Sequence, residues 1–180
     1  MRSLPPAALH AESPEVYYSE APLPLADDAI VAFLKERAAE TPRKRCRLCT
    51  HRGATDAFHE MLIVHSHDTY VRPHRHLRRE ESLTVLEGTA SLVIFDDRGS
   101  IERTVTLGER GSGKAFYYRM PAARWHTLVI DSEWFVFLES TTGPFNPEGS
   151  ENASWAPDGI DAHLANAWLE GLRSRLPVVS

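Results

Sequence analysis

Two histidines separated by one residue, His74 and His76, are the residues whose types and spacing most clearly indicate chemistry. Two adjacent acidic residues, Glu80 and Glu81, follow them closely, and a further histidine, His126, lies much later in the chain. Imidazole nitrogens and a carboxylate oxygen together suit a divalent transition metal. The sequence therefore predicts a metal site assembled from two separated segments.

The elements that must position these side chains are β-strands. In a strand, residues two apart point to the same side, so His74 and His76 can both face a barrel interior while Arg75 faces away. A turn can bring the carboxylate at the start of the next strand to the same point, and Gly88 suits the end of that hairpin. His126 comes from a distant strand. Such a four-ligand set leaves one or two coordination positions open.

A second His-x-His segment, His65 and His67, provides a comparison within the same chain of nine histidines. Where the first pair is followed by glutamate, this pair has Arg72, and we predict no metal there. The remaining histidines, His10, His51, His59 and His163, are interpreted as surface or hydrogen-bonded residues. For His51 and His59, a role near the mouth of the site is left open.

The chain is expected to form one domain with terminal extensions. Residues 1–24 contain five prolines and form an arm that is extended or mobile unless it docks on something. Residues 25–42 carry an amphipathic helix, 45–142 form the β-barrel domain, and 143–180 hold an irregular segment and a final helix that pack on the barrel. Closely spaced strands joined by turns indicate an all-β jelly-roll or barrel.

Eight strands are predicted within the barrel domain. Their ranges are Met61–Ser66, Tyr70–Pro73, Ser82–Glu87, Ala90–Phe95, Ile101–Leu107, Ala115–Met120, Trp125–Ile130 and Trp134–Ser140.

The two cysteines, Cys46 and Cys49, are spaced for redox or zinc chemistry, but a closed zinc site needs a second pair of ligands. We interpret them as reduced cysteines in a β segment.

Charge and composition exclude some partners. A net charge of −5 argues against nucleic acid, because affinity for the phosphate backbone comes from concentrated lysine and arginine. The longest apolar run, from Ala29 to Leu34, is too short to cross a membrane, and no signal-peptide pattern opens the chain. The expected location is the cytoplasm. Arginines near the predicted site, Arg75, Arg78 and Arg79, suggest a small anionic ligand.

At this point the residues resemble those of the cupin superfamily, whose fold is a double-stranded β-helix, and more narrowly those of the WbuC family of cupin-fold metalloproteins. The likeness rests on segments between residues 45 and 157, among them Arg45–His51, His59–Met61, Tyr70–His76, Phe116–Arg119, Trp125–Thr127, Gly143–Phe145 and Trp155–Pro157. The terminal helices and the arm lie outside it.

The resemblance implies a ligand set of His74, His76, Glu81 and His126. Glu81 is chosen over Glu80 because the six-residue step to the glycine of the cupin pattern counts from Glu81. Two positions depart from the pattern: Ala123 stands where glycine is usual, and Ile130 where asparagine is usual. Neither is a ligand position, but the turn before His126 is expected to differ.

Other candidate residues could assist a reaction. Candidates for moving protons are Tyr70, Tyr118 and His59, and candidates for binding substrate are Arg72, Arg79, Arg119, Arg124 and Trp155. For each tyrosine and arginine, packing or surface charge is the alternative.

Three functions remain open from the sequence. The first is a metal-dependent isomerase, epimerase or lyase that acts on a sugar or sugar nucleotide, since the family resemblance implies a link to bacterial surface-polysaccharide (O-antigen) biosynthesis. The second is an Fe(II) dioxygenase, and the third is a non-catalytic module that binds a small ligand. The ligand types do not choose among Fe, Mn, Zn, Ni and Co. A homodimer is a further expectation.

Overall fold

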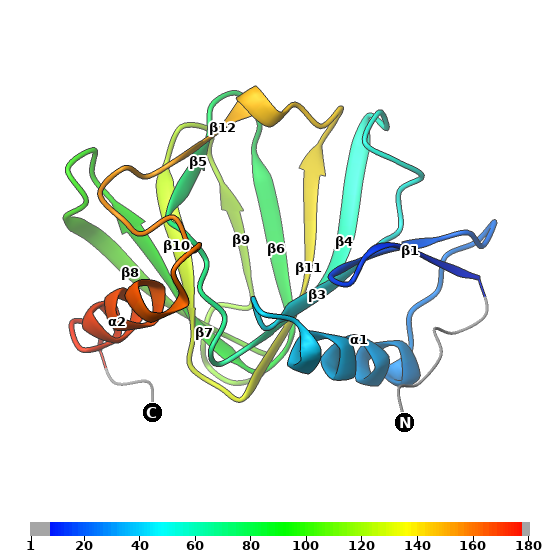
Figure 1. Cartoon of the computed structure of the whole chain (residues 1–180), viewed down its shortest axis with the longest axis horizontal. Helices are drawn as coiled ribbons and strands as arrows, with labels where there is room; N and C mark the ends of the chain where they lie inside the picture. The colour runs from blue at the N-terminus through cyan, green and yellow to red at the C-terminus, as the bar shows by residue number, and fades with distance from the viewer. Residues whose placement is uncertain (1–7, 178–180) are drawn as a thin grey trace.

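The computed structural model describes residues 8–177, which form two β-sheets and two α-helices (Figure 1). The strands are β1 (Leu9–Ser13), β2 (Val16–Ser19), β3 (Arg45–Cys49), β4 (Phe58–Ser66), β5 (His74–His76), β6 (Glu81–Glu87), β7 (Thr89–Phe95), β8 (Ile101–Gly108), β9 (Tyr117–Met120), β10 (Trp125–Ile130), β11 (Trp134–Thr142) and β12 (Ser150–Asn152). The helices are α1 (Asp28–Glu40), α2 (Ala162–Arg173) and the short 3-10 helix η1 (Pro147–Gly149).

From β4 to β11 the chain passes back and forth between two sheets, with the consecutive strands β7 and β8 paired in the smaller one. The larger sheet has the order β1-β2-β3-β4-β11-β6-β9, and the smaller has the order β12-β5-β10-β7-β8. Neighbouring strands are antiparallel except β2 and β3, which pair in parallel within the described chain. This order is that of a jelly-roll barrel, a double-stranded β-helix of the cupin type, and it confirms the predicted fold class.

The main core fills the space between the two sheets. Its buried members come from both, because alternate residues of each strand face inward. They include Met61, Ile63, Leu83, Val85, Phe135 and Phe137 from the larger sheet and Ala90, Leu92, Ile94, Leu128 and Ile130 from the smaller. Burying these side chains stabilises the barrel whose interior carries the predicted site.

Each helix covers the outer face of one sheet, and the two lie on opposite sides of the barrel (Figure 1). Asp27 caps α1 by accepting a hydrogen bond from the amide of Ile30 at 3.0 Å, and Asp161 caps α2 in the same way. The buried face of α1 packs against β3 and β4, and that of α2 packs against β7 and β10. Both helices lie within the ranges predicted from the sequence.

The N-terminal arm contributes strands. Residues 9–19 form a hairpin of β1 and β2, and β2 extends the larger sheet by pairing with β3. The predicted arm therefore docks on the barrel between residues 8 and 19, while Pro5 and Pro6 lie outside the described residues, as do residues 178–180 of the predicted C-terminal segment.

One predicted strand is wrong in its position. Residues 70–73 form no strand, and β5 begins only at His74. Pro73 lacks an amide hydrogen, and the carbonyl oxygens before β5 are bound by other groups: Val71 accepts from the Thr127 hydroxyl, and Pro73 accepts from the amide of Ala153. These tertiary contacts replace a ladder of backbone hydrogen bonds.

The two cysteines lie in β3, as expected. Cys46 belongs to the cluster beneath α1, whereas Cys49 belongs to the core between the sheets. Their thiols therefore lie on opposite faces of one strand.

Among residues 8–177, no helix is both long enough and apolar enough to span a membrane.

Candidate metal centre

His74 and His76 lie on β5, a short strand held on both sides. His74 is directly opposite His126 of β10, and His76 is opposite Ser150 of β12. Arg75, between them, turns away and places its guanidinium 4.4 Å from the centre of the Trp125 ring. The alternation predicted from the sequence is therefore present, and it brings three imidazoles together.

Glu81 completes the group from the other sheet. It is the first residue of β6, and its carboxylate oxygens lie 2.9 Å from His76 Nε2 and 3.1 Å from His126 Nε2. One ligand atom from each of His74, His76, Glu81 and His126 lies within 4.8 Å of the others. Glu81 and His126 are buried, with 4% and 2% of their surface exposed. The neighbouring Glu80 pairs instead with Arg119 at the surface.

Each imidazole is oriented by a hydrogen bond at its outer nitrogen. Nδ1 of His74 donates to the Arg72 carbonyl oxygen and Nδ1 of His126 to that of Arg124, both at 2.9 Å. Nδ1 of His76 lies 2.8 Å from the Ser150 hydroxyl. Because a carbonyl can only accept, His74 and His126 carry their proton on Nδ1 and present the Nε2 lone pair inward.

The donor set fits a divalent transition metal. His126 Nε2 is buried and, within residues 8–177, makes no well-directed hydrogen bond although the Glu81 carboxylate is near. A buried nitrogen with no aligned partner is unfavourable unless another group satisfies it. Three nitrogens and one carboxylate oxygen, with outer hydrogen bonds that fix the rings, are suitable ligands for such an ion.

The charges of the group favour a cation. Burial alone would raise the pKa of Glu81, but the adjacent His126 and His76 imidazoles hold that pKa well below its usual range. Burial and the nearby His126 lower the pKa of His74 to about 4. Burial opposes protonation of His126 as well, yet the Glu81 carboxylate raises the pKa of His126 above its ordinary value. At neutral pH, Glu81 is therefore ionised and His74 is neutral.

The group opens into a cavity of about 380 Å³ inside the barrel. Tyr118 lines it and donates a hydrogen bond to Glu81 Oε1 at 3.1 Å. Burial and the Glu81 charge raise the pKa of Tyr118 well above its usual range, so the phenol keeps its proton at neutral pH. Arg79, another residue predicted from the sequence, also lines the cavity.

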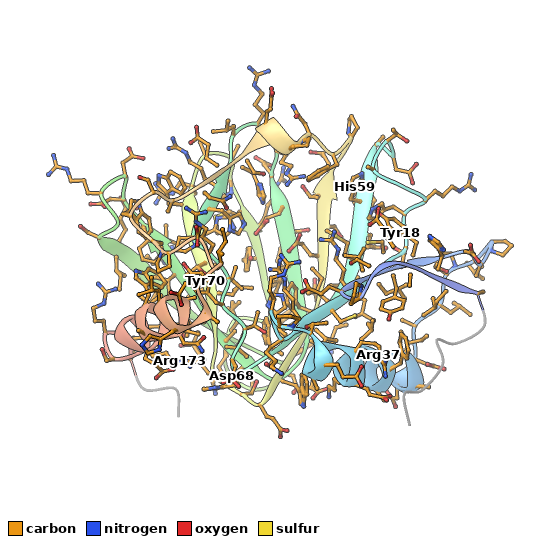
Figure 2. All side chains as sticks on the ribbon, in the orientation of Figure 1. Tyr18, Arg37, His59, Asp68, Tyr70 and Arg173 are labelled. Atoms are coloured by element: carbon orange, nitrogen blue, oxygen red, sulfur yellow. The ribbon has the colours of Figure 1, made fainter. Side chains whose placement is uncertain are left out.

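The two other predicted proton carriers lie outside this cavity, and Figure 2 shows them on different sides of the molecule. The Tyr70 hydroxyl donates to the Pro157 carbonyl oxygen at 2.8 Å, beside α2. His59 is buried near the start of β4 and stacks on His51 at 4.2 Å between ring centres. These contacts explain how both side chains are packed, and a role in catalysis stays a prediction.

The remaining predicted substrate-binding residues are also placed away from the cavity. Arg119 and Arg124 form exposed ion pairs with Glu80 and Glu102. Arg72 donates to the Ala153 carbonyl oxygen at 2.9 Å and lines a neighbouring hollow, which also reaches His74. Trp155 packs beneath α2, 4.9 Å from the centre of the Phe95 ring.

Several charged residues that line the cavity were not predicted as site residues. They are Glu15, Arg43, Arg45, Arg47 on β3 and Glu139 on β11. Burial and the Glu81 charge raise the pKa of Glu139 to about 8. The alternating pattern Arg45-Cys46-Arg47-Leu48-Cys49 is the signal that could have indicated Arg47, because residues 45, 47 and 49 must share one face. Helix α1 covers the other face of β3, and this leaves the face with residues 45, 47 and 49 turned toward the cavity.

A family model described as "Domain of unknown function (DUF6016)" matches residues 26–107. No curated protein matches the chain at a significant level.

Several solved structures are similar in fold. A protein from Shewanella oneidensis has a TM-score of 0.48 at 13% identity, with 73% of this chain and 82% of that chain covered. Oxalate decarboxylase from Bacillus subtilis has a TM-score of 0.43 at 19% identity, with 68% and 31% covered. A sugar phosphate isomerase of the cupin superfamily from Silicibacter pomeroyi has a TM-score of 0.39 at 21% identity, with 49% and 52% covered. The chain thus spans about a third of the decarboxylase and half of the isomerase.

Proposed function

We propose that the chain is a cupin-type metalloenzyme that binds one divalent transition metal through His74, His76, Glu81 and His126 and acts on a small oxygenated molecule. The observation that carries this proposal is the convergence of three oriented imidazoles and one buried carboxylate at the wall of a cavity. When bound, such an ion supplies Lewis acidity toward a substrate oxygen. The reaction class that we favour is an isomerase, epimerase or lyase step.

The protein residues provide proton carriers beside the ligand group. Tyr118 holds a proton on its hydroxyl and directs it toward Glu81, so the same hydroxyl is placed to donate to a substrate in the cavity. Burial raises the pKa of Glu139 above its ordinary value, which makes its carboxyl group a candidate to accept or donate a proton near neutral pH. Tyr118 and Glu139 line the cavity that also holds the four ligand residues, so both can contact a substrate bound there.

The size of the cavity favours a small substrate. At about 380 Å³ it lies near the lower end of the volumes of ligand sites, roughly 300–1,000 Å³. This volume supports a single sugar unit more than a sugar nucleotide.

The likeness of residues 45–157 to the WbuC family supports a substrate from bacterial surface-polysaccharide metabolism. A cytoplasmic location and a homodimer remain part of the proposal, and light scattering in solution tests the dimer.

A turnover assay tests the proposed function. Metal-loaded protein is incubated with small hydroxy- and keto-sugars and sugar acids, and products are detected by NMR. We expect Tyr118→Phe to lower the rate about 100-fold or more with metal content unchanged, since a positioned proton donor contributes factors of that size. Tyr117→Phe, which alters the exposed neighbour on β9, is the control and should retain the rate. Absence of turnover would favour a non-catalytic binding module, and oxygen uptake with Fe(II) would favour a dioxygenase.

A further inference from the structure

Two arginines in the cavity have no carboxylate partner. Arg47 and Arg79 both line the cavity that holds the histidine group, and neither forms an ion pair within residues 8–177. The Nε atom of each guanidinium is buried without a hydrogen-bond partner in the same part of the chain. Arg79 is oriented by its Nη2 donor, which lies 3.2 Å from the Ser150 hydroxyl. Two positive groups therefore face a shared interior space.

Two other partly buried arginines, Arg45 and Arg75, are neutralised by carboxylates of the protein. Arg45, two residues before Arg47 on the same strand, pairs with Glu15. Arg75, which points out of the barrel, pairs with both Glu151 and Asp97. Arg45 and Arg47 lie on the same face of β3. Of these two, only Arg45 has a carboxylate within ion-pair distance in the described chain.

The acidic residues of the cavity do not balance these charges. Glu81 is already bound by His76 and His126. Glu139 forms no ion pair with either guanidinium group in the described chain, and Glu15, which also lines the cavity, pairs with Arg43 and Arg45. A buried charge without a counter-ion is costly, so the cavity favours an anion that enters it.

We propose that Arg47 and Arg79 form a subsite for an oxyanion, the carboxylate or phosphate of a small substrate whose remaining atoms reach the His74, His76, Glu81 and His126 group. The planar guanidinium fork suits both anions, because its parallel N–H groups match two oxygens of a carboxylate or phosphate. Ser150 links the two parts, since its hydroxyl lies near both His76 Nδ1 and Arg79 Nη2. This inference rests on the proposed function and specifies the chemical class of its substrate.

Three probes of matched shape test the subsite: glucuronate, glucose 6-phosphate and glucose. Binding is measured by calorimetry on the full chain, once with metal bound and once after chelation. We expect at least one of the two anions to bind at millimolar concentration, and glucose to bind about tenfold more weakly or worse, because it lacks the charge. The anion that binds identifies the source as a carboxylate or a phosphate. Failure of both anions to bind overturns the proposal.

Substitutions locate the binding. Arg47→Met and Arg79→Met should each weaken the anion about tenfold to 100-fold, the range expected for losing charged hydrogen bonds. Arg103→Met, on the exposed side of β8, is the matched control and should bind as the wild type does. Circular dichroism and metal content confirm that each variant is folded. Arg47→Lys keeps the charge without the fork and should bind with intermediate strength.

The outcomes separate this inference from the proposed function. Anion binding that depends on Arg47 and Arg79 but occurs in a protein that never takes up metal supports the subsite and contradicts the metalloenzyme. Stoichiometric metal with anion binding that is unchanged in both methionine variants contradicts the subsite and leaves the metal site intact. Equal binding of glucose and the anions also contradicts the subsite.

Discussion

The two His-x-His segments of this chain, His74/His76 and His65/His67, have the same spacing and different surroundings. Both rings of the first pair belong to β5 and converge on Glu81. In the second pair, His65 is the last but one residue of β4, and His67 lies beyond the end of the strand and is exposed. The same local pattern therefore places two rings together in one case and separates them in the other.

The neighbours of the two pairs explain the difference in chemistry. His65 lies opposite Arg45 in the sheet, and its Nδ1 has no hydrogen-bond partner in the described chain. Burial and the charge of Arg45 lower the pKa of His65 to about 3. His76, by contrast, faces a carboxylate and is held at Nδ1 by Ser150. A metal site requires the acid and the outer hydrogen bonds as well as the spacing.

The largest expected difference between the pairs is in stabilisation by metal. Chelated protein titrated with Zn²⁺ or Mn²⁺ should gain about 4 kcal/mol at a concentration 1,000 times the dissociation constant, which raises the unfolding temperature by roughly 8–16 °C for a domain of this size. His126→Ala should abolish this rise in thermal melts, because it removes one of four ligands. His67→Ala should keep it, and an equal loss in both variants would remove the distinction between the pairs.

The outer hydrogen bond to His76 should have the next largest effect. Ser150→Ala removes the group that orients His76 Nδ1, and we expect metal affinity to fall about 10- to 100-fold, as for other outer-shell partners. Competition with a fluorescent chelator measures the affinity. Ser174→Ala, at the end of α2, is the control. Unchanged affinity in the Ser150 variant would mean that the hydroxyl does not orient the ring.

For the second pair, we expect His65 to affect how the free energy of unfolding depends on pH. The folded pKa of His65, about 3, lies below the unfolded value of about 6.5, so the unfolded chain binds a proton that the folded chain does not. Stability is therefore lost as pH falls from about 6.5 toward 3, and the loss from this residue is about 2 kcal/mol at pH 5. Urea unfolding of metal-free His65→Leu should show a shallower acid dependence than wild type. His67→Leu should follow the wild type, and identical slopes in all three proteins would contradict the account.

The smallest effect concerns the backbone that holds β5. Ala123 has φ of +63°, a left-handed conformation in which alanine is strained, and its amide donates to the His76 carbonyl oxygen at 2.6 Å. Ala123→Gly should stabilise the protein by about 1 kcal/mol in urea unfolding, because glycine adopts this conformation freely. Ala122→Gly, at the adjacent residue with negative φ, should destabilise it instead. A gain in both variants would indicate another cause.

Strand alternation indicated from the sequence that His74 and His76 share one face, and the resemblance to the cupin pattern, counted back from Gly88, supplied Glu81 and His126. Gly88 has φ of +81°, and a side chain there would collide with the Trp134 carbonyl and the Ser132 hydroxyl. The jelly-roll class followed from the spacing of strands with clear alternation, and β4, β6–β8, β10 and β11 lie where they were expected.

The features that were not predicted depend on tertiary contacts, which local sequence patterns do not indicate. The strands β1 and β2 lie in a proline-rich region and form because β3 offers a free edge. The position of β5 is set by partners more than 40 residues away, His126 and Ser150. Arg47 and Glu139 were missed because nothing local indicates which face of β3 or β11 turns toward the cavity.

The central claim is that His74 and His76, and not His65 and His67, belong to a metal site. Elemental analysis of protein purified without added metal tests it most directly. We predict about one transition-metal ion per chain in the wild type and in His67→Ala, and almost none in folded His76→Ala, since the remaining ligands bind too weakly. Retention of about one ion per chain in His76→Ala, or equal loss in His67→Ala, would contradict the claim.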